Sequence, residues 1–232
     1  MERHSHNSTL RFAQFTHVGT VHPQNEDTIL CAPHYGLWAV ADGMGGHQEG
    51  QFASQRIVHH LAQMSTTLND SADPVGHLQQ CLAESNHALY QYARLQSEDT
   101  IVGSTVVALW LSGDVFHVLW SGDSPCYLLR DDTLSLLTPP HVDPMAPHIL
   151  TRAIGGYHEP EIDYYGGTIY ENDRFLLCSD GINKVFSDAD IKAHLSADCE
   201  SLDAHCEAWL QHALTTGSPD NISAIVIDVG GS

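Results

Sequence analysis

Residues 37–46 read LWAVADGMGG, an apolar run that ends in an aspartate followed by glycines. A similar pattern occurs at residues 174–181, RFLLCSDG, and in reverse order at residues 218–229, SPDNISAIVIDV. Short apolar runs bounded by turn residues are typical of buried strands. Each such strand would bring one carboxylate to the loop at its end. The sequence therefore predicts a β-rich core that gathers acidic side chains.

These strand-end carboxylates are Asp42, Asp180 and Asp220, and the acidic pair Glu26-Asp27 precedes a further apolar run. Carboxylates that meet at one point repel one another unless cations lie between them. Oxygen ligands suit hard cations such as Mg²⁺ and Mn²⁺ rather than Zn²⁺ or copper. A single Asp-Gly is also a common hairpin turn, so only the combination predicts a site for hard divalent metals.

Hydrophobic periodicity predicts an α+β fold. Amphipathic helices are expected at residues 49–65 and 75–96, with shorter helices at 188–195 and 201–215. Strands are expected at residues 12–21, 28–32, 37–41, 101–111, 115–121, 126–130, 134–137, 164–170, 175–178 and 222–229. Regular βαβ alternation is absent, which favours mostly antiparallel sheets covered by helices.

The connecting segments contain no linker that would divide the chain. Four prolines mark residues 139–147 as a loop, and residues 150–154 are expected to form a short helix ending at Gly155-Gly156. We expect one domain over residues 1–232, with residues 1–10 as a flexible N-terminus. The length is sufficient for a substantial hydrophobic core.

The charge balance excludes several classes of partner. The chain has 29 Asp and Glu against 9 Lys and Arg, a formal net charge of −20. Nucleic-acid binders and proteins that bind anionic membranes need basic surfaces, so neither partner is expected. The sequence shows no signal peptide and no apolar stretch long enough for a membrane span. Six cysteines without a C-x-x-C pair favour a reducing compartment, so a cytoplasmic location is expected.

Seven short motifs follow one another along the chain. They are NED at 25–27, ADGMGG at 41–46, GST at 103–105, GDS at 122–124, LTRAIGG at 150–156, SDG at 179–181 and DNIS at 220–223. In this order the chain resembles the metal-dependent protein serine/threonine phosphatases of the PPM family, type 2C, in their small bacterial stand-alone form. The resemblance extends from about residue 15 to about residue 228.

The resemblance implies an αββα fold, in which two antiparallel sheets form a sandwich flanked by helix pairs. It also implies two Mn²⁺ or Mg²⁺ ions at one end of the sandwich, with a third, weaker ion in bacterial members. Asp42 would bridge the two metals and Gly43 would offer its backbone carbonyl. By the same resemblance Asp180 and Asp220 would complete the first metal's shell and Glu26 would serve the second.

The remaining site assignments also rest on the resemblance. Asp27 would orient the bridging water, and Asp123 would help Asp180 to bind the third metal. The implied reaction is hydrolysis of phosphoserine and phosphothreonine on proteins by a metal-bridging hydroxide, without a phosphoenzyme. Two metals that share a water lower its pKa and stabilise in-line attack on phosphorus.

Three departures from the family pattern concern the substrate. His22 stands where an arginine usually grips the substrate phosphate, and histidine does so poorly above its pKa of about 6.5. The run Thr138-Pro139-Pro140-His141-Val142 replaces a usual Thr-x-Asp-His-Ser, and the segment after it is short, which leaves the metal centre more open. Met44 follows Asp-Gly, so the leaving group would take its proton from water or from His47.

The leading hypothesis is a cytoplasmic phosphoprotein phosphatase that opposes a bacterial Ser/Thr kinase, with type VI secretion as one conceivable setting. The alternative is a degenerate phosphatase fold that binds phosphoproteins without cleaving them. His22 favours the alternative, whereas the intact set of Glu26, Asp42, Asp180 and Asp220 favours the enzyme. A structural domain for calcium or magnesium would not explain why the acids come from distant strand ends.

Overall fold

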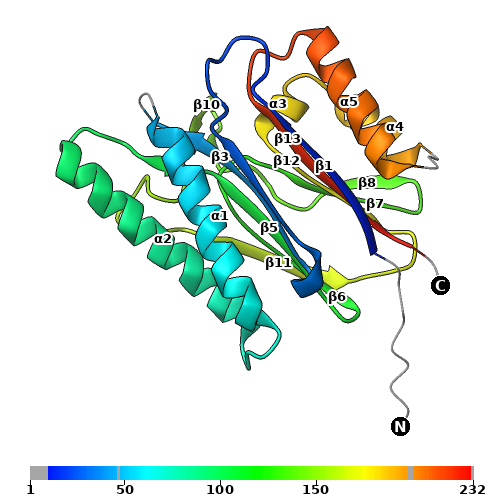
Figure 1. Ribbon diagram of the computed structural model, residues 1–232, viewed down its shortest axis with the longest axis horizontal. Coiled ribbons are helices and arrows are strands. Elements are labelled where there is room, and N and C mark those ends of the chain that lie inside the picture. The colour runs from blue at the N-terminus through cyan, green and yellow to red at the C-terminus, as the bar shows by residue number, and fades with distance from the viewer. Residues whose placement is uncertain (1–9, 46–47, 198–200, 231–232) are drawn as a thin grey trace.

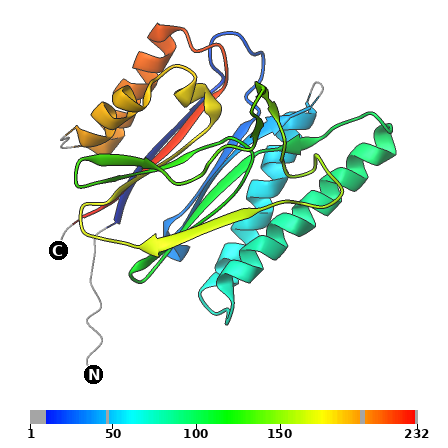
Figure 2. The same cartoon turned by 180° about the vertical axis from the view of Figure 1, so that it is seen from behind.

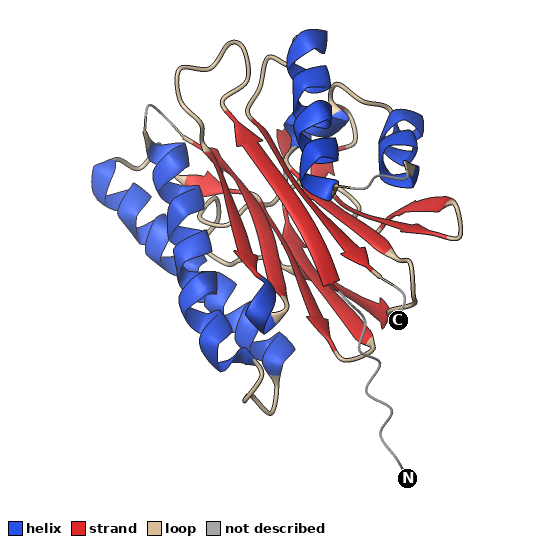
Figure 3. Cartoon of the chain, turned by 45° about the vertical axis from the view of Figure 1, so that its right-hand side comes forward, coloured by secondary structure: helices blue, strands red, loops and turns tan. Residues whose placement is uncertain are grey.

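Two antiparallel sheets lie face to face, and helices cover the outer side of each sheet (Figures 1 and 3). This computed structural model describes residues 10–45, 48–197 and 201–230. One sheet has the strand order β11 (Asp163–Thr168), β6 (Val115–Ser121), β5 (Val106–Ser112), β3 (Leu37–Met44) and β2 (Asp27–Ala32), and β4 (Gly103–Ser104) pairs with β3. Seen from behind, β11 forms the edge of this sheet (Figure 2).

The second sheet has the order β1 (Leu10–His17), β13 (Ile222–Val229), β12 (Arg174–Cys178), β7 (Cys126–Arg130) and β8 (Thr133–Leu136). A separate hairpin contains β9 (Val142–Asp143) and β10 (Ala146–Leu150). The helices are α1 (Glu49–Leu68), α2 (Pro74–Gln96), α3 (Asp180–Asn183), α4 (Asp188–Ser196) and α5 (Leu202–Thr216), with a 3₁₀ turn at Pro33–Tyr35. The predicted α+β sandwich flanked by helix pairs is confirmed.

Alternation along the strands creates three apolar layers. On β3, Ala39 and Ala41 pack into the cluster that contains the inner faces of α1 and α2, whereas Trp38 and Val40 pack into the cluster between the sheets. On β13, Val226 belongs to the layer under α4 and α5. Successive side chains of a strand point to opposite faces, so strands buried on both faces read as continuous apolar runs.

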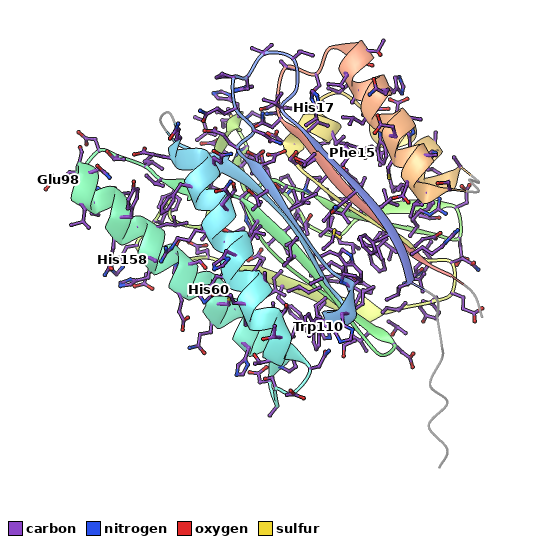
Figure 4. All side chains as sticks on the ribbon, in the orientation of Figure 1. Phe15, His17, His60, Glu98, Trp110 and His158 are labelled. Carbon is purple, nitrogen blue, oxygen red and sulfur yellow. The ribbon has the colours of Figure 1, made fainter. Side chains whose placement is uncertain are left out.

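Strand register brings the acidic residues to one end of the sandwich. Asp27 pairs directly with Asp42 across β2 and β3. Cys178 pairs with Ala224, so Asp180 and Asp220 lie just beyond the same end of the second sheet. Figure 4 marks this end by His17, which pairs with Ile222, and marks the opposite end of β5 by Trp110.

Two sequence predictions were wrong around residues 139–154. The expected loop contains the β9–β10 hairpin, whose register shifts between Ala146 and Leu150, an irregularity that accommodates Pro147. The expected helix at 150–154 does not form, because Ile154 exchanges two backbone hydrogen bonds of 2.9 Å with Ser104. These bonds use the groups that a helix would need.

The first strand also differs from its prediction. It ends at His17 rather than at residue 21, because Gly19 has φ +78° and approaches the carbonyl of Asp220 so closely that a Cβ would lie 1.9 Å from it. Of the segment 1–10, expected to be flexible, only Leu10 is described, and it begins β1. Among the described helices, none is long and apolar enough to cross a membrane.

Candidate metal centre

Asp42 lies near the end of β3, where its backbone is fixed on both sides. Its N–H donates to Thr105 Oγ1 at 3.2 Å, and its carbonyl accepts from the N–H of Thr105 at 2.9 Å and from Ser104 Oγ at 2.9 Å. Burial raises the pKa of the Asp42 carboxyl well above its usual range, and the charges of nearby aspartates raise it further. Those aspartates are Asp27, Asp180, Asp220 and Asp123. The structure thus brings the predicted aspartates within electrostatic reach of Asp42.

Asp27 is buried, with 7% of its surface exposed, and its carboxylate accepts a hydrogen bond from a serine hydroxyl. Ser179 Oγ donates to Asp27 Oδ2 at 2.7 Å, whereas Oδ1 is buried and has no hydrogen-bond partner. Burial raises the pKa of Asp27 to about 6, against hydrogen bonds from Ser223 and Ser179 that lower it. One oxygen of this carboxylate is therefore positioned by the protein while the other lacks a partner.

Asp180 and Asp220 share a cation supplied by the chain itself. Lys184 Nζ lies 2.5 Å from Asp180 Oδ2 and 3.0 Å from Asp220 Oδ2. Burial lowers the pKa of Lys184, but the hydrogen bonds and charges of both aspartates outweigh burial, so its pKa is raised. Asp180 Oδ1 is buried without a hydrogen-bond partner, and burial raises the pKa of Asp180. Sequence reasoning missed Lys184, although its position four residues after Asp180 could have indicated the contact.

Glu26 is positioned through its backbone and lies against α1. Its N–H donates to Asn221 Oδ1 at 2.7 Å, and its carbonyl accepts from the N–H of Gly43 at 3.1 Å. A Cβ on Gly50 would lie 2.8 Å from the Glu26 carboxyl carbon, and a Cβ on Gly43 would lie 2.0 Å from the Gly50 carbonyl oxygen. At Gly43 the obstacle is backbone, so only glycine fits there, whereas a side chain on Gly50 would displace the Glu26 carboxylate. Burial raises the pKa of Glu26, His22 lowers it and Asp220 raises it.

Asn221 is a second residue whose role sequence reasoning did not identify. Its Nδ2 donates to the carbonyls of Val18 at 2.9 Å and Gln24 at 3.1 Å, and its Oδ1 accepts from Glu26. Asn221 therefore ties the loop after β1 to the start of β13. Its position directly after Asp220 in the DNIS motif was the available signal.

Asp123 lies in the turn between β6 and β7. Burial raises its pKa to about 6, the charge of Asp180 raises it as well, and Lys184 lowers it. The next residue, Ser124, forms a hydrogen bond of 2.6 Å with Thr105, which in turn holds the backbone of Asp42. The turn that carries Asp123 is thus connected to Asp42 through one threonine.

His22 lies beside the acidic residues, with Nε2 3.5 Å from Asp220 Oδ1 and 49% of its side chain exposed. It can reach both Asp220 and solvent, as a phosphate-binding residue must. His47, considered as a proton donor, falls outside the described residues.

The residues present fit Mn²⁺ or Mg²⁺ by their chemistry. The side chains that would hold the ions offer carboxylate oxygens, which hard cations prefer. One oxygen of Asp180 is buried without a hydrogen-bond partner, and so is one oxygen of Asp27, which would orient the water. Within residues 10–45, 48–197 and 201–230, no three His, Cys, Asp or Glu side chains form a group arranged to hold a metal ion. Lys184 instead bridges Asp180 and Asp220. The ligand assignments of Glu26, Asp42, Gly43, Asp123, Asp180 and Asp220 stay predictions.

Comparison with known proteins agrees with the fold. The αββα sandwich is the fold of solved bacterial serine/threonine phosphatases. A profile described as Protein phosphatase 2C matches residues 22–216, and the chain belongs to this family. The serine/threonine protein phosphatase PstP of Mycobacterium tuberculosis is 30% identical over 95% of this chain. The chain spans 45% of the length of that relative.

Further relatives match over most of their own length. The serine/threonine phosphatase stp of Listeria innocua is 27% identical, with 82% of each chain covered. A solved structure of PppA, described as a key regulatory component of the type VI secretion system in Pseudomonas aeruginosa, is 37% identical. It has a TM-score of 0.87 and covers 95% of this chain and 97% of its own. The PstP catalytic domain solved with two manganese ions is 30% identical, with a TM-score of 0.83 and coverage of 95% and 98%.

Proposed function

We propose that this chain hydrolyses phosphoserine and phosphothreonine monoesters on proteins with the help of two divalent cations. One observation carries the proposal: carboxylates from distant strand ends lie within electrostatic reach of one another, and burial, together with their mutual repulsion, raises the pKa values of Asp42, Asp27 and Asp123. Groups with strongly shifted pKa values are typical of functional sites, and bound divalent cations would neutralise the repulsion between these carboxylates. The named phosphatases in the family support the same reaction.

Glu26, Asp42, Gly43, Asp180 and Asp220 would hold the cations, which we expect to be Mn²⁺ or Mg²⁺. When bound, such a pair of cations lowers the pKa of a water and neutralises the charge of the phosphate. The solved PstP domain with two manganese ions supports this number. We further propose a third, weaker ion at Asp123 and Asp180, whose charges act on each other.

The chain's own residues would do the rest of the chemistry. Asp27 Oδ1, buried and without a partner, is the atom that we assign to orient the attacking water, while the bond from Ser179 fixes the carboxylate. His22 would bind the substrate phosphate from the rim of the site, where its side chain is half exposed. Arginine would do so more strongly, because its charge does not depend on pH near neutrality.

We also propose a biological setting, in which this domain acts in the cytoplasm as a phosphatase that opposes a Ser/Thr kinase. The likeness to PppA, a regulatory component of type VI secretion in Pseudomonas aeruginosa, supports secretion control as one such setting.

Hydrolysis of a phosphothreonine peptide, with Mn²⁺ and with EDTA, tests the proposed activity. We expect turnover with Mn²⁺, its loss with EDTA and its loss in Asp180→Asn. Asp114→Asn is the matched control, because Asp114 is exposed in the turn between β5 and β6, at the opposite end of the sandwich. A protein that binds the peptide and Mn²⁺ without turnover would contradict the enzyme and favour the phosphoprotein-binding alternative.

A further inference from the structure

His141 connects the turn that carries Asp123 to the β9–β10 hairpin. It is 8% exposed and matches the histidine of the family's Thr-x-Asp-His-Ser pattern, whereas its neighbours Pro140 and Val142 depart from that pattern. Its backbone N–H donates to the Gly122 carbonyl at 3.0 Å, and the Gly122 N–H donates to His141 Nδ1 at 3.1 Å. The two residues thus exchange hydrogen bonds, although prolines occupy the two positions before His141.

These contacts fix the tautomer of His141. A backbone N–H is always a donor, so Nδ1 must be the acceptor and the ring proton must lie on Nε2. Nε2–H then faces Asp163 Oδ2 at 3.2 Å, and Arg152 Nη1 donates to the other oxygen, Oδ1, at 2.8 Å. Arg152 Nη1 also lies 3.3 Å from His141 Nε2. In this tautomer both nitrogens are donors, so they do not form a hydrogen bond with each other. The salt bridge of Arg152 to Glu161 at 2.9 Å holds the guanidinium in place.

Gly122 has a backbone conformation and close surroundings that exclude a side chain. Its φ is +113°, and a Cβ there would lie 2.6 Å from the Cβ of Thr105. Thr105 therefore packs against one side of the turn, while His141 holds it from the other through both hydrogen bonds. The direction in which the next residue, Asp123, points depends on this turn.

The other side of His141 holds the hairpin. Its carbonyl accepts from the N–H of Thr151 at 2.8 Å, just after β10, and β9 begins at the next residue, Val142. The ring also stacks on Trp120 of β6, with centroids 5.8 Å apart and planes inclined by 14°. One buried histidine therefore fixes both ends of the hairpin to the strand that leads to Asp123.

We propose that His141 is a positioning residue that fixes Asp123 and the β9–β10 hairpin relative to each other through its reciprocal hydrogen bonds with Gly122. The proposal rests on the proposed function in one respect, namely that Asp123 binds a weak metal ion. It predicts that damage to the Gly122–His141 contact weakens metal binding without any change to a ligand.

Two variants of nearly equal size separate positioning from simple packing. Asparagine places Oδ1 near the position of Nδ1 and can accept from Gly122, whereas glutamine places its amide near Nε2 and cannot. Both remove the stack on Trp120. His148→Gln is the control, since His148 lies exposed on β10 of the same hairpin.

Equilibrium binding of Mn²⁺, followed by the electron paramagnetic resonance of free Mn²⁺, gives the first readout. Leaving the buried Gly122 N–H without an acceptor should weaken the weakest Mn²⁺ site about tenfold in His141→Gln. His141→Asn should stay within a factor of about three, and His148→Gln should match the wild type. In the Asp123→Asn background, His141→Gln should not weaken Mn²⁺ binding further, because the effects of two residues that act through the same site are not additive. Equal weakening in both His141 variants, or no weakening in His141→Gln, overturns the proposal.

Hydrogen exchange and NMR of the wild type and of His141→Asn test the positioning role even if His141→Gln folds poorly. In the wild type, the ¹⁵N shifts of His141 should report the Nε2–H tautomer, and the Nδ1–H tautomer would overturn the proposal. In His141→Asn, the Gly122 amide should stay protected, and rapid exchange there would also overturn it. None of these readouts uses turnover, so a failure of the proposed phosphatase activity is seen separately in the peptide assay.

Discussion

Replacing Lys184 by methionine should tighten Mn²⁺ binding, although it removes two salt bridges. The ammonium lies 2.5 Å from Asp180 Oδ2 and 3.0 Å from Asp220 Oδ2, so it pairs with the oxygens that we assign to the first metal. A cation that binds these oxygens must displace Lys184 from them. Methionine keeps most of the length of the side chain and removes the charge.

The size of the change in Mn²⁺ affinity follows from the solvent exposure of Lys184 in its two salt bridges. The Lys184 side chain is 52% exposed, so solvent screens its attraction to the carboxylates. Pairs of this kind contribute about 0.2–1 kcal/mol each, and two of them contribute about 0.4–2 kcal/mol. Since 1.4 kcal/mol corresponds to a factor of ten, the dissociation constant for Mn²⁺ should fall roughly two- to thirtyfold. The metal-free protein should lose a similar amount of stability.

Calorimetric titration with Mn²⁺ and thermal unfolding in EDTA measure the two quantities. Lys192→Met is a close control, because Lys192 is the only other lysine in the sequence and lies on α4. It pairs at 2.9 Å with Asp132, in the turn after β7, whereas Asp123 precedes the opposite end of that strand. Lys192→Met should leave the Mn²⁺ affinity unchanged. Weaker or unchanged Mn²⁺ binding in Lys184→Met would refute the competition between Lys184 and the metal.

Two further predictions concern protonation and substrate binding. The pKa of Asp27 is raised from 3.8 to about 6, so the metal-free fold is destabilised as pH rises through that range. The gain in Tm of Asp27→Asn over the wild type in EDTA should grow between about pH 4 and about pH 7, and a gain that shrinks would contradict the burial of this charge. His22→Arg should lower KM for a phosphopeptide on the order of tenfold, by adding a charge-assisted bond to phosphate. An unchanged KM would exclude His22 from substrate binding.

The sequence predicted most of the strands and the carboxylates at their ends by local rules, whereas the resemblance to the family implied that these carboxylates gather at one end of the sandwich. Apolar runs before Asp42 and Asp180 mark the buried strands β3 and β12. These strands belong to different sheets, and the face-to-face packing of the two sheets brings their ends together. The contacts between elements were not predictable in this way. Lys184 reaches Asp220 from 36 residues away, and the 22-residue step from His141 to Asp163 depends on how the hairpin folds back.

The errors at residues 139–154 have the same origin. The prolines at 144 and 147 indicate a loop by local rules, but the β9–β10 hairpin forms because β4 and the turn at Gly122 offer partners to the backbone. The backbone of Ser104 forms hydrogen bonds with both backbone groups of Ile154, and the carbonyl of His141 accepts from the N–H of Thr151. Tertiary partners thus decided the structure of a segment whose local preferences were weak.

The most direct test of the proposed metal-dependent phosphatase activity is phosphate release from a phosphothreonine peptide as Mn²⁺ is added to chelator-treated protein. We predict that the wild type shows turnover that saturates with Mn²⁺ and disappears with EDTA. Asp42→Asn, which removes the proposed bridging carboxylate, should show none at any Mn²⁺ concentration. Turnover that persists in EDTA, or that survives in Asp42→Asn, would contradict the account.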